Sequence, residues 1–150
     1  GPDSEALASH VLFLDEFLFQ EHQKGQFKLP LQKISQEKIW VHGHCHQKAA
    51  NATGSTLGIL KTIPGLEVEL IPSSCCGMAG SFGYESENYE ISMKMAELSL
   101  LPKIRSLDQN HGIVACGTSC RQQIQHGSGK SAMHTAQILR QAISEASSIN

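Results

Sequence analysis

Five cysteines carry the clearest chemical signal in this chain of 150 residues. They follow the pattern C-x29-C-C-x39-C-x3-C, as Cys45, the neighbours Cys75 and Cys76, then Cys116 and Cys120. Thiolates are soft ligands that suit zinc and iron–sulfur clusters. An odd number of cysteines cannot pair completely, and no secretory signal is visible, so a disulfide framework is the weaker interpretation. The pattern therefore indicates a metal or redox site.

The adjacent cysteines Cys75 and Cys76 indicate which kind of metal site the chain forms. Neighbouring cysteines do not easily chelate one tetrahedral ion, because the backbone splays their side chains, so they more naturally hold two metals of a polynuclear cluster. A zinc finger would instead show two close pairs. Gly77, Gly80 and Gly83 let the backbone turn sharply beside a cluster and offer N–H groups to its sulfurs. A strained vicinal disulfide, or a glycine-rich turn with two buried structural cysteines, remains open.

Three histidines lie close to the first cysteine in the sequence. His44 and His46 flank Cys45, and a neutral imidazole can bind zinc or shuttle a proton. The alternative is that these two histidines support or cap the loop. His42 lies on the preceding apolar segment, where we expect a packed or sheet-edge residue. The histidines without a partner signal are expected at the surface: His10, His22, His111 and His126.

Each group of candidate ligands follows a short apolar segment. We expect strands at residues 38–42, 66–71, 112–115 and 132–133. The first three precede the cysteine segments, and the fourth precedes His134. In an α/β sheet, functional residues gather where parallel strands end and helices begin. Four loops at one edge would therefore bring together groups that are far apart in the sequence.

Helical patterns separate these strands. We expect helices at residues 47–62, 86–101, 119–125 and 135–146. In the second of them, Ile91, Met95 and Leu98 are expected to face the core. An N-terminal helix is predicted by a stripe of apolar residues (Leu7, Val11, Leu14 and Leu18), with Asp3 or Ser4 as its cap, before a polar linker at 21–28. The alternation predicts a single α/β domain with a mainly parallel sheet of about four strands.

Composition excludes several classes of function. The net charge of −2 leaves no basic field for a nucleic acid backbone, and no apolar run approaches the roughly 20 residues of a membrane span. The segment Gly129-Lys130-Ser131 resembles the end of a P-loop, but Ile124 occupies the position of its first glycine. We therefore expect no nucleic acid partner, no transmembrane segment and no nucleotide loop.

Four segments resemble a known family. VHGHCHQKA, SSCCGMAGSFGYE, CGTSCRQQI and MHTAQIL are similar to successive segments of the CCG domain. This cysteine-rich domain occurs in a subunit of heterodisulfide reductase and in iron–sulfur subunits of glycolate oxidase and lactate-utilisation enzymes. The segments are most similar to the C-terminal region of proteins that fuse an FAD-linked oxidase to iron–sulfur modules. The resemblance covers residues 38 to 145.

The resemblance implies a cluster, of the 4Fe–4S type, bound by Cys45, Cys75, Cys76 and a cysteine of the third segment. The general family pattern ends in C-x-x-C, whereas Cys116 and Cys120 are separated by three residues here. We assign Cys120, because it matches the family turn and because a helix N-terminus favours a thiolate. Cys116 is an optional further ligand. Zinc is the alternative metal, since other copies of the domain look zinc-binding.

The resemblance also implies residues that line the cluster. His134 matches a family histidine at the start of the last helix, and we expect it to line the site without binding the metal. Gly77, Gly80 and His46 are likewise expected to line the cofactor. Residues 1–37 are expected to form an N-terminal helix and linker, and residues 38–150 the cluster-binding domain.

The implied function is electron transfer within a larger FAD-dependent oxidoreductase that acts on a 2-hydroxy acid such as glycolate, lactate or 2-hydroxyglutarate. No flavin-binding segment is visible, so the chain should not oxidise that substrate alone. The expected partners are a flavin-binding oxidase domain, which holds the FAD, and other iron–sulfur domains. The expected location is the cytoplasm, free or held at the inner membrane face by partners. The alternative function is a structural zinc or interaction module of the same kind of complex.

Overall fold

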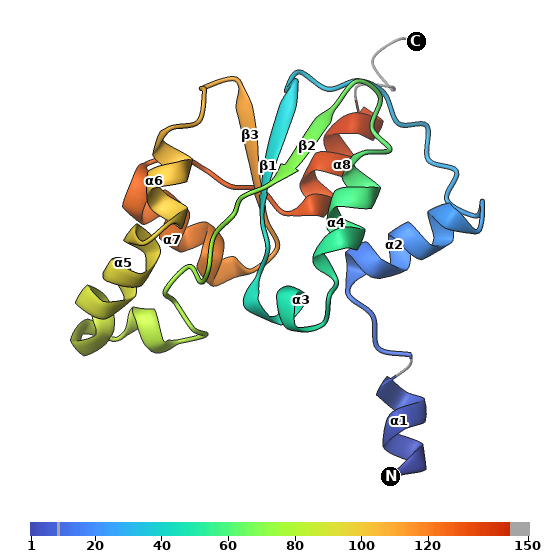
Figure 1. Cartoon of the computed structure of the whole chain (residues 1–150). Coiled ribbons are helices and arrows are strands. Elements are labelled where there is room, and N and C mark those ends of the chain that lie inside the picture. Colours follow the sequence, from blue (N-terminus) through green and yellow to red (C-terminus); the bar gives the residue numbers. More distant parts are fainter. Residues whose placement is uncertain (9, 145–150) are drawn as a thin grey trace.

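A computed structural model describes residues 1–8 and 10–144 (Figure 1). The strands are β1 (Lys38–His42), β2 (Glu67–Leu70) and β3 (His111–Ala115). The helices are α1 (Pro2–Ala8), α2 (Leu14–Gln23), α3 (Cys45–Ala49), α4 (Thr53–Leu60), α5 (Tyr89–Glu97), α6 (Leu100–Arg105), α7 (Thr118–Ser128) and α8 (Thr135–Ser144). Two 3-10 turns, at Phe82–Tyr84 and Ser86–Asn88, precede α5.

The three strands form one parallel sheet in the order β2-β1-β3. Val41 of the central strand pairs with Leu70 on one side and with Val114 on the other. Each parallel connection needs a crossover, which α3 and α4 supply after β1, and α5 and α6 supply after β2. This arrangement confirms the predicted α/β class, the parallel sheet and the flanking helices.

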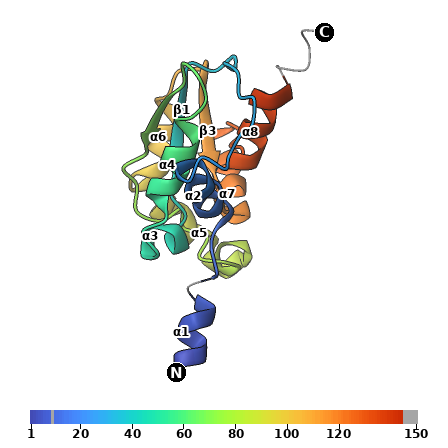
Figure 2. The same cartoon turned by 90° about the vertical axis from the view of Figure 1, so that its right-hand side faces the viewer.

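Helices cover both faces of the sheet (Figures 1 and 2). On one face, Ile39, Val41 and Val114 pack with apolar residues of α4 and α8 and with Leu18 and Phe19 of α2. On the other face, Ile113 and Ala115 pack with α6 and α7, and this second cluster includes Cys76 and Cys120. Strands β1 and β3 are therefore largely buried, as is typical of parallel sheets, whereas only Val68 is buried in the edge strand β2.

The fourth predicted strand is reduced to a single bridge. Met133 pairs with Val114, and its N–H donates to Ile113 O at 2.8 Å. Gly129 ends α7 in the left-handed conformation, and α8 already begins at Thr135. Only Met133 of this segment pairs with β3, and the sheet has three strands among the described residues.

Three predicted helices are broken, including the one expected at 86–101, which divides into a 3-10 turn at Ser86–Asn88, α5 and α6. The N-terminal pattern forms two helices, α1 and α2, instead of one continuous helix. The segment predicted at 47–62 divides into α3 and α4, because Asn51 has a positive φ of 55° that an α-helix does not accept. The polar linker predicted at 21–28 begins later, since α2 continues to Gln23 before the turn at Gly25.

The predicted inner stripe of α5 is wrong. Ile91 is 53% exposed and Leu98 is 78% exposed, whereas the buried residues of this helix are Ser92 and Ala96. Small residues face inward because a glycine-rich loop packs directly against them, with Gly77 next to the carbonyl of Ser92. In α8, by contrast, the apolar residues Ile138, Leu139 and Ala142 are buried and Ile143 is partly buried, and residues 145–146 of the predicted helix lie outside the described residues.

Candidate metal centre

Three loops at the carboxyl edge of the sheet carry the candidate ligands (Figure 1). The loop after β1 leads directly into α3, whose first residue is Cys45. His44 caps this helix, since its Nδ1 accepts a hydrogen bond from the His46 N–H at 3.3 Å. The structure thus shows His44 in the capping role that the sequence left open, and its ring lies 5.0 Å from that of His46.

The loop after β2 carries the neighbouring cysteines. Lys48 holds this loop, because its Nζ donates to Ser73 O at 2.5 Å and to Ser74 O at 2.6 Å. Gly77 has a φ of +89°, and its N–H donates to Cys75 Sγ at 3.3 Å. The backbone turn at Gly77 therefore directs an N–H group at one of the candidate ligand sulfurs.

The loop after β3 leads into α7, and Cys120 is the third residue of that helix. Gly117 precedes the helix in the position of its cap, and a Cβ there would lie 2.5 Å from His44 Cδ2 and 3.1 Å from Cys120 Sγ. Arg121 fixes the loop by donating to Cys116 O at 2.7 Å. A side chain at residue 117 would therefore displace groups of the candidate site.

The inner part of the site is a buried group of three residues. Cys120 Sγ donates to Cys76 Sγ at 3.2 Å. His42 offers one ring nitrogen, and this nitrogen and the two sulfurs lie within 4.8 Å of one another. All three residues are at most 3% exposed. The sequence pattern predicts His42 only as a packed or sheet-edge residue. Its position at the end of a strand, three residues before Cys45, could have identified it as a candidate ligand.

The outer part of the site consists of Cys45 and Cys75. Cys45 is exposed and Cys75 is partly exposed. Partial burial raises the pKa of Cys45, as do its hydrogen bond with Cys75 and negative charge on Cys75 and Cys76, while the Lys48 ammonium lowers it. Cys45 and Cys75 therefore interact with each other, and Cys45 also interacts with the buried sulfur of Cys76.

The two buried thiols share one proton. The hydrogen bond from Cys120 lowers the pKa of Cys76 to about 4 against the opposing effect of burial, with smaller help from His42 and the Met78 backbone N–H. The same hydrogen bond raises the pKa of Cys120, and burial and negative charge on Cys76, Cys45 and Cys75 add to this increase. A cation that binds both sulfurs would displace the shared proton.

Cys116 has different surroundings. Its Sγ lies 3.3 Å from Asp15 Oδ2 and 3.3 Å from Thr135 Oγ1. Burial raises the pKa of the Cys116 thiol, and the charge of Asp15 raises it further. Asp15 also accepts hydrogen bonds from Thr56 and Thr135 at 2.5 and 3.1 Å, so it holds a buried polar network that the sequence pattern did not predict. Cys116 belongs to this network and the other four cysteines to the loop site.

Two other predicted residues have local roles in the structure. His134 caps α8, because its Nδ1 accepts from the Ala136 N–H at 3.1 Å. Gly80 has a φ of +71°, and a Cβ at this position would meet nothing within 4 Å. Neither residue contacts a candidate ligand within the described part of the chain, so their cofactor roles remain predictions.

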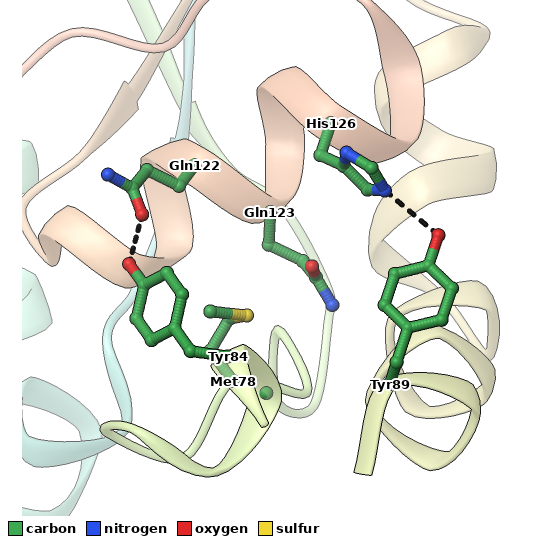
Figure 3. A pocket seen from close by; sticks show the side chains of 7 residues that line it. Met78, Tyr84, Tyr89, Gln122, Gln123 and His126 are labelled. Carbon is green, nitrogen blue, oxygen red and sulfur yellow. Dashed lines mark hydrogen bonds between the residues drawn. The ribbon is translucent and has the colours of Figure 1, made fainter. Parts of the chain in front are cut away.

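A small pocket of about 280 Å³ lies beside the glycine-rich loop (Figure 3). The Tyr84 hydroxyl pairs with Gln122 of α7, and the Tyr89 hydroxyl lies 2.9 Å from His126 Nε2 on the same helix. Met78, two residues after Cys76, also lines this pocket. The two tyrosines thus brace the loop and α5 against the helix that carries Cys120.

Comparison with known proteins gives related dehydrogenases. The chain is 29% identical over 143 residues to one subunit of the anaerobic glycerol-3-phosphate dehydrogenase of Escherichia coli K12, covering 94% of this chain and 35% of that protein. It is 32% identical over 136 residues to D-2-hydroxyglutarate dehydrogenase of Pantoea ananatis and 33% identical over 116 residues to that of E. coli K12. The shares of these two proteins that it covers are 13% and 11%.

The chain therefore spans about a third of the first relative and a much smaller part of the others. No family model and no solved structure matches it. In the described part of the chain, no helix combines the length and the apolar character that crossing a bilayer requires. The comparisons thus relate this chain to a portion of larger dehydrogenases.

The residues at the loop site fit a bound metal group. Four cysteines and one histidine supply donors of the type that zinc and iron–sulfur clusters use. His42 Nε2 is a buried polar atom without a hydrogen-bond partner among the described residues, which a metal would satisfy. In the described part of the chain, only His42, Cys76 and Cys120 form a group of three ligand atoms within 4.8 Å of one another, and the more exposed Cys45 and Cys75 lie outside this group.

Proposed function

We propose that this chain is an iron–sulfur electron-transfer domain of the CCG type, within a larger FAD-dependent oxidoreductase. The proposal is supported by Cys76 and Cys120, whose sulfurs lie 3.2 Å apart, and by the positions of Cys45 and Cys75 in the segments that follow β1 and β2 at the same sheet edge. Cys75 is partly exposed and Cys76 is buried, so the two neighbouring sulfurs have different surroundings. Such a splayed pair suits two metals of one cluster better than one ion.

A 4Fe–4S-type cluster at this site supplies a centre that accepts and releases single electrons. The chain's own residues hold it and control its surroundings. Cys76 and Cys120 hold its buried side, where water is excluded, and Cys45 holds the side that a partner can approach. The Gly77 N–H, already directed at Cys75 Sγ, tunes the potential by hydrogen bonding.

The relatives support a shared role in electron transfer. Their names denote dehydrogenases of two different hydroxylated substrates, glycerol-3-phosphate and D-2-hydroxyglutarate, yet each contains a region similar to this chain. A region common to both suits a step that both reactions share, which is the removal of electrons. We propose that the substrate of the parent protein is a 2-hydroxy acid, with 2-hydroxyglutarate the first to test, ahead of glycolate and lactate.

The partners in this proposal are a flavin-binding oxidase domain, which carries the FAD, and other iron–sulfur domains. We propose that residues 38–150 hold the cluster and that helix α2 packs against this unit through Leu18 and Phe19. The location is the cytoplasm, or the inner face of the membrane when partners attach there. Without the flavin domain, the chain does not oxidise the hydroxy acid by itself.

Anaerobic reconstitution with Fe²⁺ and sulfide tests the proposal. We expect a brown protein with bound iron and sulfide, whose visible absorbance bleaches on reduction. Cys76→Ser and Cys120→Ser should lose the iron, because each removes a buried ligand. Cys116→Ser is the matched control, since this residue bonds Asp15 and Thr135, and it should retain the cluster. Equal loss in all three variants would contradict the assignment of Cys116.

A structural zinc site is the second candidate function. It is supported by the inner group of His42, Cys76 and Cys120, which offers three ligands of the types that zinc uses. A colourless protein that binds one zinc tightly and takes up no iron under the same conditions would favour this candidate.

A further inference from the structure

His42 has a buried side chain directed toward the candidate ligands. It is the last residue of β1, the central strand, and is 1% exposed. One of its ring nitrogens and the sulfurs of Cys76 and Cys120 lie within 4.8 Å of one another. These three residues come from the three different loops or strand ends that form the site.

The two ring nitrogens of His42 have different surroundings. Nδ1 lies 2.8 Å from Ser73 Oγ, whereas Nε2 is buried and has no hydrogen-bond partner among the described residues. When Nδ1 donates its proton to Ser73, Nε2 carries the lone pair that a metal requires. An unpaired buried polar atom is unfavourable, and a cation bound between the ring and the sulfurs of Cys76 and Cys120 would satisfy this nitrogen.

Ser73 is placed to keep the ring in this orientation. It lies in the loop that Lys48 holds through the Ser73 carbonyl, two residues before Cys75. A hydrogen bond to the second ring nitrogen is the usual support of a histidine ligand, because it fixes both the tautomer and the direction of the ring. His42 therefore has a free donor atom, two thiol neighbours and a group that orients it.

We propose that His42 binds the metal through Nε2, together with Cys76 and Cys120, on the buried side of the site. The inference rests on the proposed function for the identity of the metal group, an iron–sulfur cluster. A neutral imidazole adds a donor atom without adding negative charge. The potential of the cluster should therefore be higher than with a further thiolate at the same position.

Nitrogen coupling in the reduced cluster gives the direct test. The chain is produced with ¹⁵N-labelled histidine, reconstituted with Fe²⁺ and sulfide, and measured by pulsed electron paramagnetic resonance. We expect the strong coupling of a directly bound imidazole, its loss in His42→Asn and its retention in the control His22→Asn, at an exposed position of α2. The Asn side chain keeps a polar group near the position of Nδ1 and removes Nε2.

A second measurement uses Co²⁺ alone and does not need a cluster. Co²⁺ is titrated anaerobically into each apo variant and followed by its visible absorbance. We expect His42→Asn to weaken binding by about 100-fold or more, and Ser73→Ala by roughly 10- to 100-fold, since groups that orient a ligand contribute that much. His22→Asn should bind Co²⁺ as the wild type does.

The outcomes separate this inference from the proposed function. A cluster that forms but shows no histidine coupling, or keeps the coupling in His42→Asn, overturns the role of His42 and leaves the electron-transfer function standing. A chain that takes up no cluster overturns that function, and the Co²⁺ titration then decides the role of His42. A loss of affinity in His42→Asn no larger than in Ser73→Ala overturns the inference. Circular dichroism checks each variant, and His42→Gln replaces His42→Asn if the latter fails to fold.

Discussion

At Gly77, the backbone conformation and the packing both disfavour a side chain. This residue combines a φ of +89° with close packing, since a Cβ would lie 2.0 Å from the Ser92 carbonyl oxygen. Gly77→Ala must therefore move α5 away from the loop or distort the turn. We expect a loss of about 3 kcal/mol or more in the free energy of unfolding, from the clash and the unfavourable φ together, measured by urea denaturation.

Gly80→Ala is the matched control for Gly77→Ala. Gly80 has a similar φ of +71°, but a Cβ there would meet nothing within 4 Å. Only the conformational penalty remains, so we expect a loss of about 1 kcal/mol. Equal losses in the two variants would show that the contact with Ser92 does not hold the loop.

Lys48 is the second residue whose contacts define the site. Its ammonium donates to two carbonyls of the loop before Cys75 and lowers the pKa of Cys45. Lys48→Met keeps the aliphatic stem and removes the charge, so the pKa of Cys45 should rise. Alkylation of Cys45 in the apo protein, followed by peptide mass spectrometry, should then shift to higher pH. Lys61→Met, at an exposed position, should leave the pH profile unchanged.

At the scale of single residues, the sequence identifies the cysteines but not their surroundings. The strand-end positions of Cys45, Cys76 and Cys120 follow from local apolar patterns. The unpaired nitrogen of His42 does not follow from a local pattern, because the orientation of the ring depends on Ser73, 31 residues away. The separate environment of Cys116 depends on Asp15, which is 101 residues distant.

At the scale of elements, short strands are predictable because each is a compact apolar segment between turn residues. Helix limits are less predictable, since Asn51 divides one expected helix through a left-handed backbone that asparagine adopts more easily than most residues. The inner face of α5 also depends on tertiary packing. Its small residues Ser92 and Ala96 are buried, and Gly77 and Gly83 of the preceding loop approach Ser92 closely.

Helix α2 is attached to the domain by one buried carboxylate and one aromatic ring. Asp15 is 2% exposed and accepts hydrogen bonds from Thr56 and Thr135. The Phe19 ring packs where Gly58 of α4 has no side chain, since a Cβ there would lie 2.4 Å from that ring. Gly58 therefore has a packing role that offsets its unfavourable helix propensity.

Asp15→Ala tests this attachment. The change leaves the hydroxyls of Thr56 and Thr135 without their acceptor in a buried position. Because an unsatisfied buried polar group costs about 1–3 kcal/mol, we expect a loss of roughly 2–4 kcal/mol in the free energy of unfolding. Gln20→Ala, at an exposed position of the same helix, should change it by less than about 0.5 kcal/mol. A loss below about 1 kcal/mol in Asp15→Ala would mean that water replaces the carboxylate.

At the scale of the whole molecule, the parallel sheet serves as the platform of the site. Its carboxyl edge gathers ligands from three loops, while the helices on its two faces bury the strands (Figures 1 and 2). Part of the site belongs to the core itself, because Cys76 and Cys120 are members of the second apolar cluster. Metal binding and folding should therefore be linked, with the metal-loaded chain more stable than the apo chain.

The N-terminal helices differ in how they contact the rest of the molecule. Helix α1 extends away from the sheet in both views and contains no buried residue (Figures 1 and 2). Helix α2 carries Asp15 and packs Leu18 and Phe19 against the first apolar cluster. The boundary of the cooperative folding unit should therefore lie between α1 and α2, closer to the N-terminus than the expected division at residue 37.

Two truncations test this boundary. Removal of residues 1–8 deletes no buried group, so the free energy of unfolding should change by less than about 0.5 kcal/mol. Removal of residues 1–23 exposes the cluster surface under Leu18 and Phe19 and leaves Thr56 and Thr135 without Asp15. Since loss of one buried large side chain alone costs about 2–5 kcal/mol, the longer deletion should lower stability by at least about 3 kcal/mol. If both truncated chains unfold at the urea concentration of the full chain, α2 lies outside the folding unit and the site depends on residues 38–150 alone.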